Sequence, residues 1–247
     1  MASATAVVIV RRARGGAAEN AARSALIRDG FSQLTGAAFL SFMFSELSLQ
    51  VVVLIGAVLF IFLHAPLWAL LSVPVVVAAV VYVCVVVTHQ ALADRHTQMM
   101  LKEEEGLVAE LRAPLGASPR DVTLRVVTEP QELTGDAAGM YPQLIGTASI
   151  SEWLGAGPRS AARLHALAVS KRWCNLGIGS ALAAAAARRA LVTGKYTVEA
   201  AASELQASAQ HMFYKRGWSS RGSYHRRLVG SALTLVITQY GKDLDMA

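Results

Sequence analysis

The sequence has few charged residues for its length. Asp, Glu, Lys and Arg make up 16% of the 247 residues, whereas 54% are hydrophobic, and the mean hydropathy is +0.42. Soluble globular domains carry about 25% charged residues. A chain this apolar is predicted to place part of its length in lipid.

The sequence also has few cysteines. Cys84 and Cys174 are poorly placed to pair, which favours a reducing compartment, and we see no metal-ligand spacing. Zinc-finger spacing and the aromatic-basic patterns of nucleic-acid-binding proteins are missing too. The net charge of +6 and the pI near 9.6 are therefore interpreted as attraction to anionic lipid headgroups, with no nucleic acid as partner.

No Asp, Glu, Lys or Arg occurs between Glu46 and Asp94. A membrane-spanning helix needs about 20 apolar residues, so this gap is long enough for two. We place the predicted spans at about residues 43–63 and 67–87. The turn between them, residues 64–66, is so short that the two spans must run antiparallel.

Positive charges flank the apolar segment and are missing from its turn. They are Arg11, Arg12, Arg14, Arg23 and Arg28 before it, and Arg95 and Lys102 after it. By the positive-inside rule, both termini are expected in the cytoplasm. The first basic cluster follows a short apolar run and does not precede a long one, so we expect no cleaved signal peptide.

Alternating and β-branched stretches predict strands in the rest of the chain, and alanine-rich or amphipathic stretches predict helices. Residues 122–127 and 144–150 are expected to be neighbours in a meander, and the charged residues 91–111 to form a solvent-exposed helix face. The expected strands are 6–11, 122–127, 144–150, 163–169, 196–201 and 232–238, and the expected helices are 19–31, 180–191 and 203–215.

This order of elements indicates one α/β domain with an inserted helical hairpin. Residues 1–35 would supply its first strand and helix, residues 36–90 the transmembrane hairpin, and residues 91–247 the remainder. Acceptor selectivity is expected in residues 130–160 and 219–230, which are interpreted mainly as loops.

A glycine pair, Gly177-Ile178-Gly179, lies at a predicted strand-to-helix junction. Free backbone N–H groups and the helix macrodipole make such a junction a phosphate site. A P-loop needs a lysine before Ser180, and a dinucleotide turn needs a small residue in place of Leu182 and a parallel βαβ unit. Both alternatives are disfavoured, which leaves a pyrophosphate turn for coenzyme A.

The residues around this pair resemble the acetyl-CoA loop of the GNAT N-acetyltransferases. Val169, Lys171-Arg172 and Gly177-Ile178-Gly179 carry this resemblance, and the superfamily's second motif is resembled by Ala209, Met212, Phe213, Lys215, Gly217 and Trp218. The opening strand with Ile-Val-Arg-Arg, a helix and two spans is similar to the camello-like, membrane-anchored N-acetyltransferases of the endoplasmic reticulum.

The resemblance implies the GNAT fold, a mixed central sheet with flanking helices, and acetyl transfer from acetyl-CoA to an amine of a small metabolite or a protein. Two positions depart from the family pattern. Cys174 stands where Arg or Gln is usual, and Phe213 stands where Tyr is common, with Tyr214 beside it. These departures leave open an inactive GNAT-fold membrane adaptor that still binds CoA. A hairpin protein that shapes the membrane is a weaker alternative.

The resemblance also implies roles for individual residues. The coenzyme is expected to lie along the backbone of Leu167, Ala168 and Val169, and near Arg172, Asn175, Leu176, Gly177, Ile178, Gly179 and Ser180. Lys171 is a further source of phosphate charge, or a solvated surface residue.

Tyr214 is the expected general acid, and His165 or Glu199 the expected base, with His211 as third choice. Alternation along the strand would place His165 on one face with Leu167 and Val169, so a core histidine is an alternative. A helix N-terminus near Cys174 would lower its thiol pKa, although we do not expect a catalytic thiol.

Overall fold

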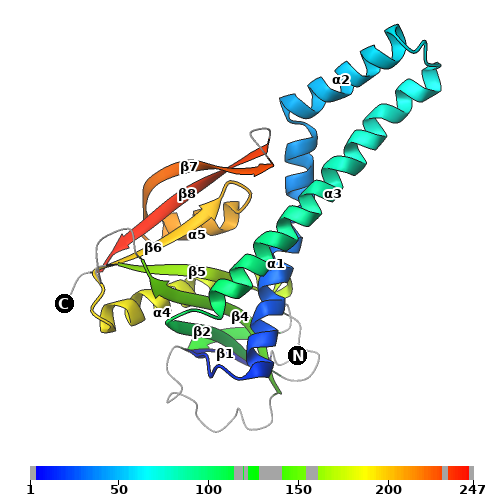
Figure 1. Ribbon diagram of the computed structural model, residues 1–247. Helices are drawn as coiled ribbons and strands as arrows, with labels where there is room; N and C mark the ends of the chain where they lie inside the picture. Colours follow the sequence, from blue (N-terminus) through cyan, green and yellow to red (C-terminus); the bar gives the residue numbers. More distant parts are fainter. Residues whose placement is uncertain are drawn as a thin grey trace.

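The computed structural model describes residues 4–113, 119, 122–127, 141–153, 161–229 and 233–244. Within them the chain forms an eight-stranded sheet with strand order β3-β1-β2-β4-β5-β6-β8-β7. The strands are β1 (Ala4–Arg12), β2 (Glu105–Ala113), β3 (Val122–Val127), β4 (Tyr141–Glu152), β5 (Ala161–Val169), β6 (Thr197–Ser203), β7 (Ser219–Val229) and β8 (Leu233–Asp243). The helices are α1 (Ala17–Met43), α2 (Glu46–Ile61), α3 (Leu67–Met100), α4 (Ile178–Val192) and α5 (Ala207–Lys215) (Figure 1).

The sheet contains both parallel and antiparallel pairs of strands, as the predicted mixed α/β sheet requires. β1 pairs with β3 and β5 with β6 in parallel, and the other neighbours are antiparallel. The predicted meander of β3 and β4 is wrong, because β3 pairs with β1 at the sheet edge and β4 lies between β2 and β5. The unit β5-α4-β6 is a parallel βαβ crossover, which the sequence analysis had taken to be missing.

Residues 91–111, which were expected to form a solvent-exposed helix face, belong to two elements. Residues 91–100 are the last turns of α3, whereas residues 105–111 belong to strand β2. Its Glu105 and Glu110 are each 7% exposed. Arg11 Nε donates to Glu110 Oε2 at 2.7 Å, and Arg189 Nη2 lies 2.7 Å from Glu105 Oε1. Because arginines of neighbouring elements neutralise these carboxylates, the strand is buried despite its charges.

The six predicted strands and the helix at 180–191 are confirmed, with ends that differ by a few residues. Strand β7 was not predicted, because residues 219–230 were expected to form a loop. The helix expected at 19–31 is only part of α1, and the one expected at 203–215 begins at Ala207. Of residues 130–160, the first range expected to give acceptor selectivity, the described residues are 141–153.

Helix α4 covers one face of the sheet, and α1 with the lower part of α3 covers the other (Figure 1). The α4 face holds the larger core, in which small side chains let helix and sheet approach closely. A Cβ on Gly146 would lie 3.0 Å from Leu182 Cδ1 and 3.2 Å from Ala109 Cβ. The opposite core is smaller and contains Ile27, Met100 and Ala166.

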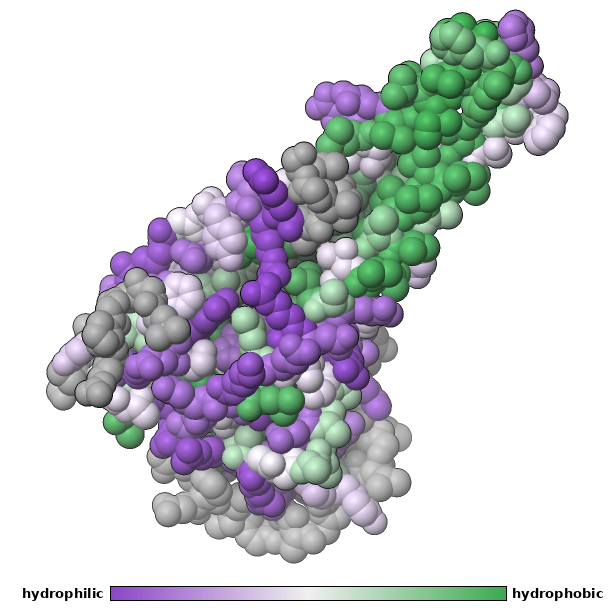
Figure 2. All heavy atoms as spheres, in the orientation of Figure 1, coloured by the Kyte–Doolittle hydropathy of each residue, from purple (hydrophilic) through white to green (hydrophobic). Residues whose placement is uncertain are grey.

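Helices α1, α2 and α3, residues 17–100, lie between β1 and β2 and are called the insertion from here on; they contain the predicted hairpin at residues 36–90 and extend beyond it on both sides. Helix α2 and much of α3 project beyond the sheet (Figure 1). Apolar side chains cover the projecting part, as Figure 2 shows. Among the described residues, α3 is long and apolar enough by itself to cross a membrane, and α1 and α2 meet that test as a pair bent by 56°. At 1.5 Å per residue, the 34 residues of α3 extend about 50 Å.

The first predicted span, residues 43–63, is not one straight helix. The chain bends at Phe44 and Ser45, and Ser45 starts α2 as its N-cap, with Oγ accepting from the Ser48 N–H at 3.4 Å. The hydroxyls of Ser45 and Ser48 both donate to the Phe42 carbonyl oxygen at 2.7 Å. A serine N-cap followed by an acidic residue is a helix-start signal that the length of the apolar run had hidden.

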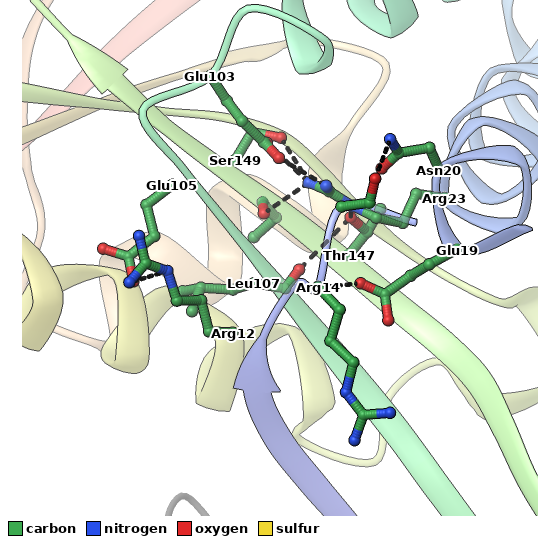
Figure 3. Close-up of polar contacts among 12 residues, drawn as sticks. Arg12, Arg14, Glu19, Asn20, Arg23, Glu103, Glu105, Leu107, Thr147 and Ser149 are labelled. Carbon is green, nitrogen blue, oxygen red and sulfur yellow. Dashed lines mark hydrogen bonds and ion pairs between the residues drawn. The ribbon is translucent and has the colours of Figure 1, made fainter. Parts of the chain in front are cut away.

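The base of the insertion is attached to the sheet through Arg23 of α1, whose side chain is 1% exposed (Figure 3). Its Nη1 and Nη2 donate to both carboxylate oxygens of Glu103 at 2.5 and 2.7 Å. Its Nε donates to Thr147 Oγ1 at 2.9 Å, and Nη2 donates to Ser149 Oγ at 3.2 Å, both on β4. One bidentate pair therefore joins α1, the connection from α3 to β2, and the centre of the sheet.

Glu103→Ala is predicted to destabilise the protein by about 3 to 5 kcal/mol, because it leaves the buried Arg23 guanidinium without its counter-ion. Chemical unfolding of the detergent-solubilised protein measures this loss. Asp94→Ala is the matched control, since its 3.0 Å pair with Arg28 also joins α3 to α1 but is exposed. That control should cost about 1 kcal/mol or less. Equal losses in the two variants would contradict the assignment.

Candidate functional site

The sheet opens where β5 and β6 separate. These parallel strands pair only from Ala161 with Thr197 to Leu164 with Ala200. Beyond Leu164, the backbone of β5 remains bonded to β4 on one side and has no β6 partner on the other. The free edge can therefore bond a ligand that lies between the two strands.

A β-bulge at Ala166 changes which side chains β5 presents to each face. Ala166 has φ of 50°, and the register with β4 shifts between Ser149, which pairs with His165, and Thr147, which pairs with Ala168. Ala166 and Ala168 consequently pack toward α1 and α3, whereas Leu167 and Val169 join the α4 core. The extra residue interrupts the alternation of a regular strand.

His165 therefore does not share a face with Leu167 and Val169, contrary to the expectation from alternation. It lies on the α1 and α3 side, close enough to His96 of α3 and Arg23 of α1 for their charges to act on it. It is 8% exposed.

A cavity of about 930 Å³ occupies the opening between β5 and β6. One side is formed by the β5 edge, the turn before α4, the end of β6 and helix α5. The other is formed by α1, α3 and the strands β7 and β8. The lining residues come from segments along most of the chain, including helices α1 and α3.

The turn before α4 explains the glycine pair. Gly177 is the N-cap of α4 with φ of 82°, a left-handed conformation that side chains rarely adopt, and it leaves the helix without a side-chain cap. Gly179 faces α5, where a Cβ would lie 3.4 Å from Met212 Sδ. Among the described residues, the N–H groups of residues 178–180 have no hydrogen-bond partner, so they are available to an anion.

The structure brings most of the predicted coenzyme residues together at this cavity. Its lining contains Leu167, Ala168, Val169, Asn175, Gly177, Ile178, Gly179 and Ser180. Arg172 and Leu176 are exposed and outside the lining, as is Lys171. The cations on this side are Lys215 and Arg216 at the end of α5, which sequence reasoning had not assigned to the pocket.

Of the predicted acid and base residues, His165 and His211 line the cavity, and Tyr214 and Glu199 do not. Tyr214 is 77% exposed. The phase of α5 explains this, because Phe213 packs inward, with its ring stacked 5.3 Å from Tyr240, and the next residue points outward. The tyrosine that does line the cavity is Tyr224, on the unpredicted strand β7.

The thiol pKa of Cys174 also differs from the lowered value that was expected. Burial raises the pKa of its thiol, although the residue lies close to the start of α4. Its Sγ donates to the carbonyl oxygens of Val169 at 3.6 Å and Ser170 at 3.4 Å. A neutral thiol held by carbonyl groups is a structural element of the turn.

Two histidines in the lining are kept neutral. Burial, together with smaller contributions from nearby positive charges, lowers the pKa of both His165 and His96 to about 4. For His165 these charges are Arg163, Arg23 and His96 itself; for His96 they are Arg163, Arg226 and Arg95. His96 was missed by sequence reasoning, because its segment was interpreted as a solvent-exposed helix.

Residues 125–218 match the sequence model described as "Acetyltransferase (GNAT) family", which is less than half of the chain. This segment contains β5, the glycine turn, α4 and α5. No curated protein matches the chain.

Several solved structures are similar to this one at low sequence identity. A GNAT-family acetyltransferase from Desulfovibrio desulfuricans has 15% identity, 96% of this chain and 98% of that chain covered, and a TM-score of 0.45. The acetyltransferase yncA from Salmonella typhimurium, with its cofactor acetyl-CoA, has 16% identity, 64% and 75% covered, and a TM-score of 0.41. A GNAT-family acetyltransferase from Elizabethkingia anophelis with acetyl-CoA bound has 11% identity, 60% and 80% covered, and a TM-score of 0.39.

The buried histidines predict a loss of stability in mild acid. The unfolded chain binds protons near pH 6.5, whereas folded His165 and His96 bind them only near pH 4, so stability falls as the pH drops through this window. By pH 4 each histidine accounts for on the order of 3 kcal/mol.

Unfolding free energies measured from pH 7.5 to 4 test this, with His165→Leu expected to flatten the profile above pH 4.5. Glu19 and Glu110 affect the profile little above pH 4.5, because carboxyl groups with lowered pKa values lose their stabilising contribution mainly below the ordinary carboxyl pKa. A profile of unchanged slope in the variant would contradict the prediction.

Proposed function

We propose that this protein is a membrane-anchored N-acetyltransferase that transfers acetyl from acetyl-CoA to an amine of a small metabolite or a protein, because residues 125–218 match the model of the GNAT acetyltransferase family. One observation supports the proposal most. The free edge of β5 and the uncapped start of α4 meet at one cavity, which offers both a strand edge and an anion site to the same ligand.

The residues of this cavity fit acetyl-CoA. The free β5 backbone at Leu167 and Val169 can bond the amides of the pantetheine arm, as a strand bonds its neighbour. The free N–H groups of residues 178–180 suit the pyrophosphate, and the left-handed Gly177 leaves open space beside them. Lys215 and Arg216 would contribute positive charge in place of the outlying Arg172.

Acetyl-CoA would supply the acetyl thioester, and the protein would orient it and accept a proton. His165 is the candidate base that is both buried and in the lining. A neutral imidazole can accept the proton that an amine releases on acylation. Tyr214 takes no part in this proposal, because it lies outside the cavity.

The membrane anchor is also proposed. On α2 and on α3 up to Val87, large apolar side chains are exposed, such as Val53 at 70% and Trp68 at 73%. A surface this apolar is suited to lipid. We propose that α3 and the α1 and α2 pair cross or enter the bilayer, most readily that of the endoplasmic reticulum, with both termini and the cavity on the cytoplasmic side.

Gly177→Ala is predicted to weaken acetyl-CoA binding about tenfold, because an alanine there strains or shifts the turn that holds the anion site. Titration calorimetry of acetyl-CoA and of desulfo-coenzyme A into the detergent-solubilised protein measures this. Gly194→Ala is the matched control, since Gly194 has φ of 75° and open space around it, at the other end of α4. It should lose similar stability and keep full affinity.

No saturable binding by the folded wild type would contradict the acetyltransferase proposal. Saturable binding without coenzyme A release in the presence of any amine would favour the inactive adaptor.

Cysteine labelling tests the proposed topology. The test uses a protein in which Cys84 and Cys174 are replaced, in vesicles whose cytoplasmic face is on the outside. His64→Cys should react with a membrane-impermeant maleimide only after these vesicles are permeabilised. Asp94→Cys should react in intact vesicles, because Asp94 lies on α3 beyond its apolar part and its side chain is 56% exposed. Labelling of both positions in intact vesicles would exclude a hairpin that crosses the bilayer.

A further inference from the structure

Three side chains that line the same cavity each carry a buried polar atom without a partner. Buried side-chain atoms without a hydrogen-bond partner among the described residues include Gln33 Nε2, His96 Nδ1 and His165 Nδ1. They come from α1, α3 and β5. The other such atoms, on Glu105 and Arg189, belong to side chains that already form a 2.7 Å ion pair.

A buried polar atom without a partner costs about 1 to 3 kcal/mol, and most folded proteins avoid it. Three such atoms in one cavity indicate a place where a ligand supplies the missing partners. His89 shows the contrast, because it also lies on α3 in the lining, yet its Nδ1 is 3.1 Å from the Thr35 hydroxyl.

The surroundings fix what these atoms can bind. The His96 ring packs 5.2 Å from the Phe31 ring. The charges that act on His96 are arginines, those that act on His165 are arginines and His96, and no carboxylate is among them. The imidazoles are therefore neutral, and in one tautomer each presents a lone pair at Nδ1. Such a pair of acceptors suits a group with two N–H donors.

We propose that a primary amine is bound between α1, α3 and β5, with one N–H donated to His165 Nδ1 and the other to His96 Nδ1. Gln33 Nε2 donates to an oxygen of the same acceptor. His96 and Gln33 are positioning residues, so the inserted helices complete the active site as well as anchoring it. This inference rests on the proposed acetyltransferase function.

The chemistry of this arrangement balances. With both N–H groups held, the nitrogen lone pair points away from the histidines and toward the opening where the thioester would lie. The nitrogen forms a bond to the acetyl carbon, the carbon–sulfur bond breaks, and the sulfur leaves with the electron pair. The nitrogen's proton passes to His165, and the thiolate takes a proton from solvent.

His96→Leu tests the proposal in the full-length, detergent-solubilised protein. Its kcat, measured by coenzyme A release with the best primary amine from a screen, should fall at least tenfold, with acetyl-CoA affinity unchanged. The folded protein should be as stable as wild type or more so, because leucine removes an unpartnered polar atom beside Phe31 and the small core of α1 and α3. If His96 had only a structural role, His96→Leu would lower the stability of the protein and leave the kcat of the folded protein unchanged.

His96→Asn should recover part of the lost kcat, because its side-chain oxygen lies near the position of Nδ1. Wild type should also prefer a primary amine over its N-methyl counterpart, and His96→Leu should lose much of that preference. Unchanged kcat in His96→Leu, or a loss of stability that accounts for the lower activity, would overturn the inference.

The failure of this inference differs from failure of the proposed function. A wild-type protein that binds acetyl-CoA but acetylates no amine overturns both. A wild-type protein that is active, with His96→Leu equally active, overturns only the role of the inserted helices.

Discussion

The ion pair of Arg23 and Glu103 is the constraint on which the rest of the structure depends. It is bidentate, almost fully buried, and bonded to Thr147 and Ser149 of the central strand β4. It fixes α1 and the end of α3 to the sheet at the point where the chain leaves for the insertion and returns from it. A buried pair is costly to desolvate, so its value lies in specifying one position for both helices. The cavity wall formed by those helices exists only if that position is kept.

The second constraint is a local break in regularity. A regular β5 would pair with β6 along its length and would alternate its side chains between the two faces. Instead, pairing stops at Leu164 and a bulge follows at Ala166. The first change frees backbone groups for a ligand, and the second turns His165 toward α1 and α3 while Leu167 and Val169 pack toward α4. In the proposed function, one strand would thereby bind a coenzyme along its edge and an acceptor on its face.

The sequence predicted the features that local patterns determine, and missed those that pairing determines. The uncharged gap, the six strands and the glycine turn could be located, because apolar runs, β-branching and left-handed glycines are local. Strand β2 was missed because Glu105 and Glu110 look solvent-exposed until their arginine partners are known. The bulge at Ala166 leaves no mark in the residue types, so alternation placed His165 on the wrong face. Tyr214 was misjudged because the inward packing of Phe213 against Tyr240 sets the phase of α5.

Helix α3 connects the proposed anchor to the proposed chemistry. Its first part carries exposed apolar side chains, and within a few turns beyond Val87 it presents His89 and His96 to the cavity. His89 and Thr35 join α3 to α1 at 3.1 Å, and Phe31 packs against both histidine rings. Because a helix is stiff along its axis, displacement of the apolar part relative to the sheet would move His96 as well. The position of the insertion and the geometry of the proposed acceptor site are therefore not independent, and the protein would have to hold the first in order to keep the second.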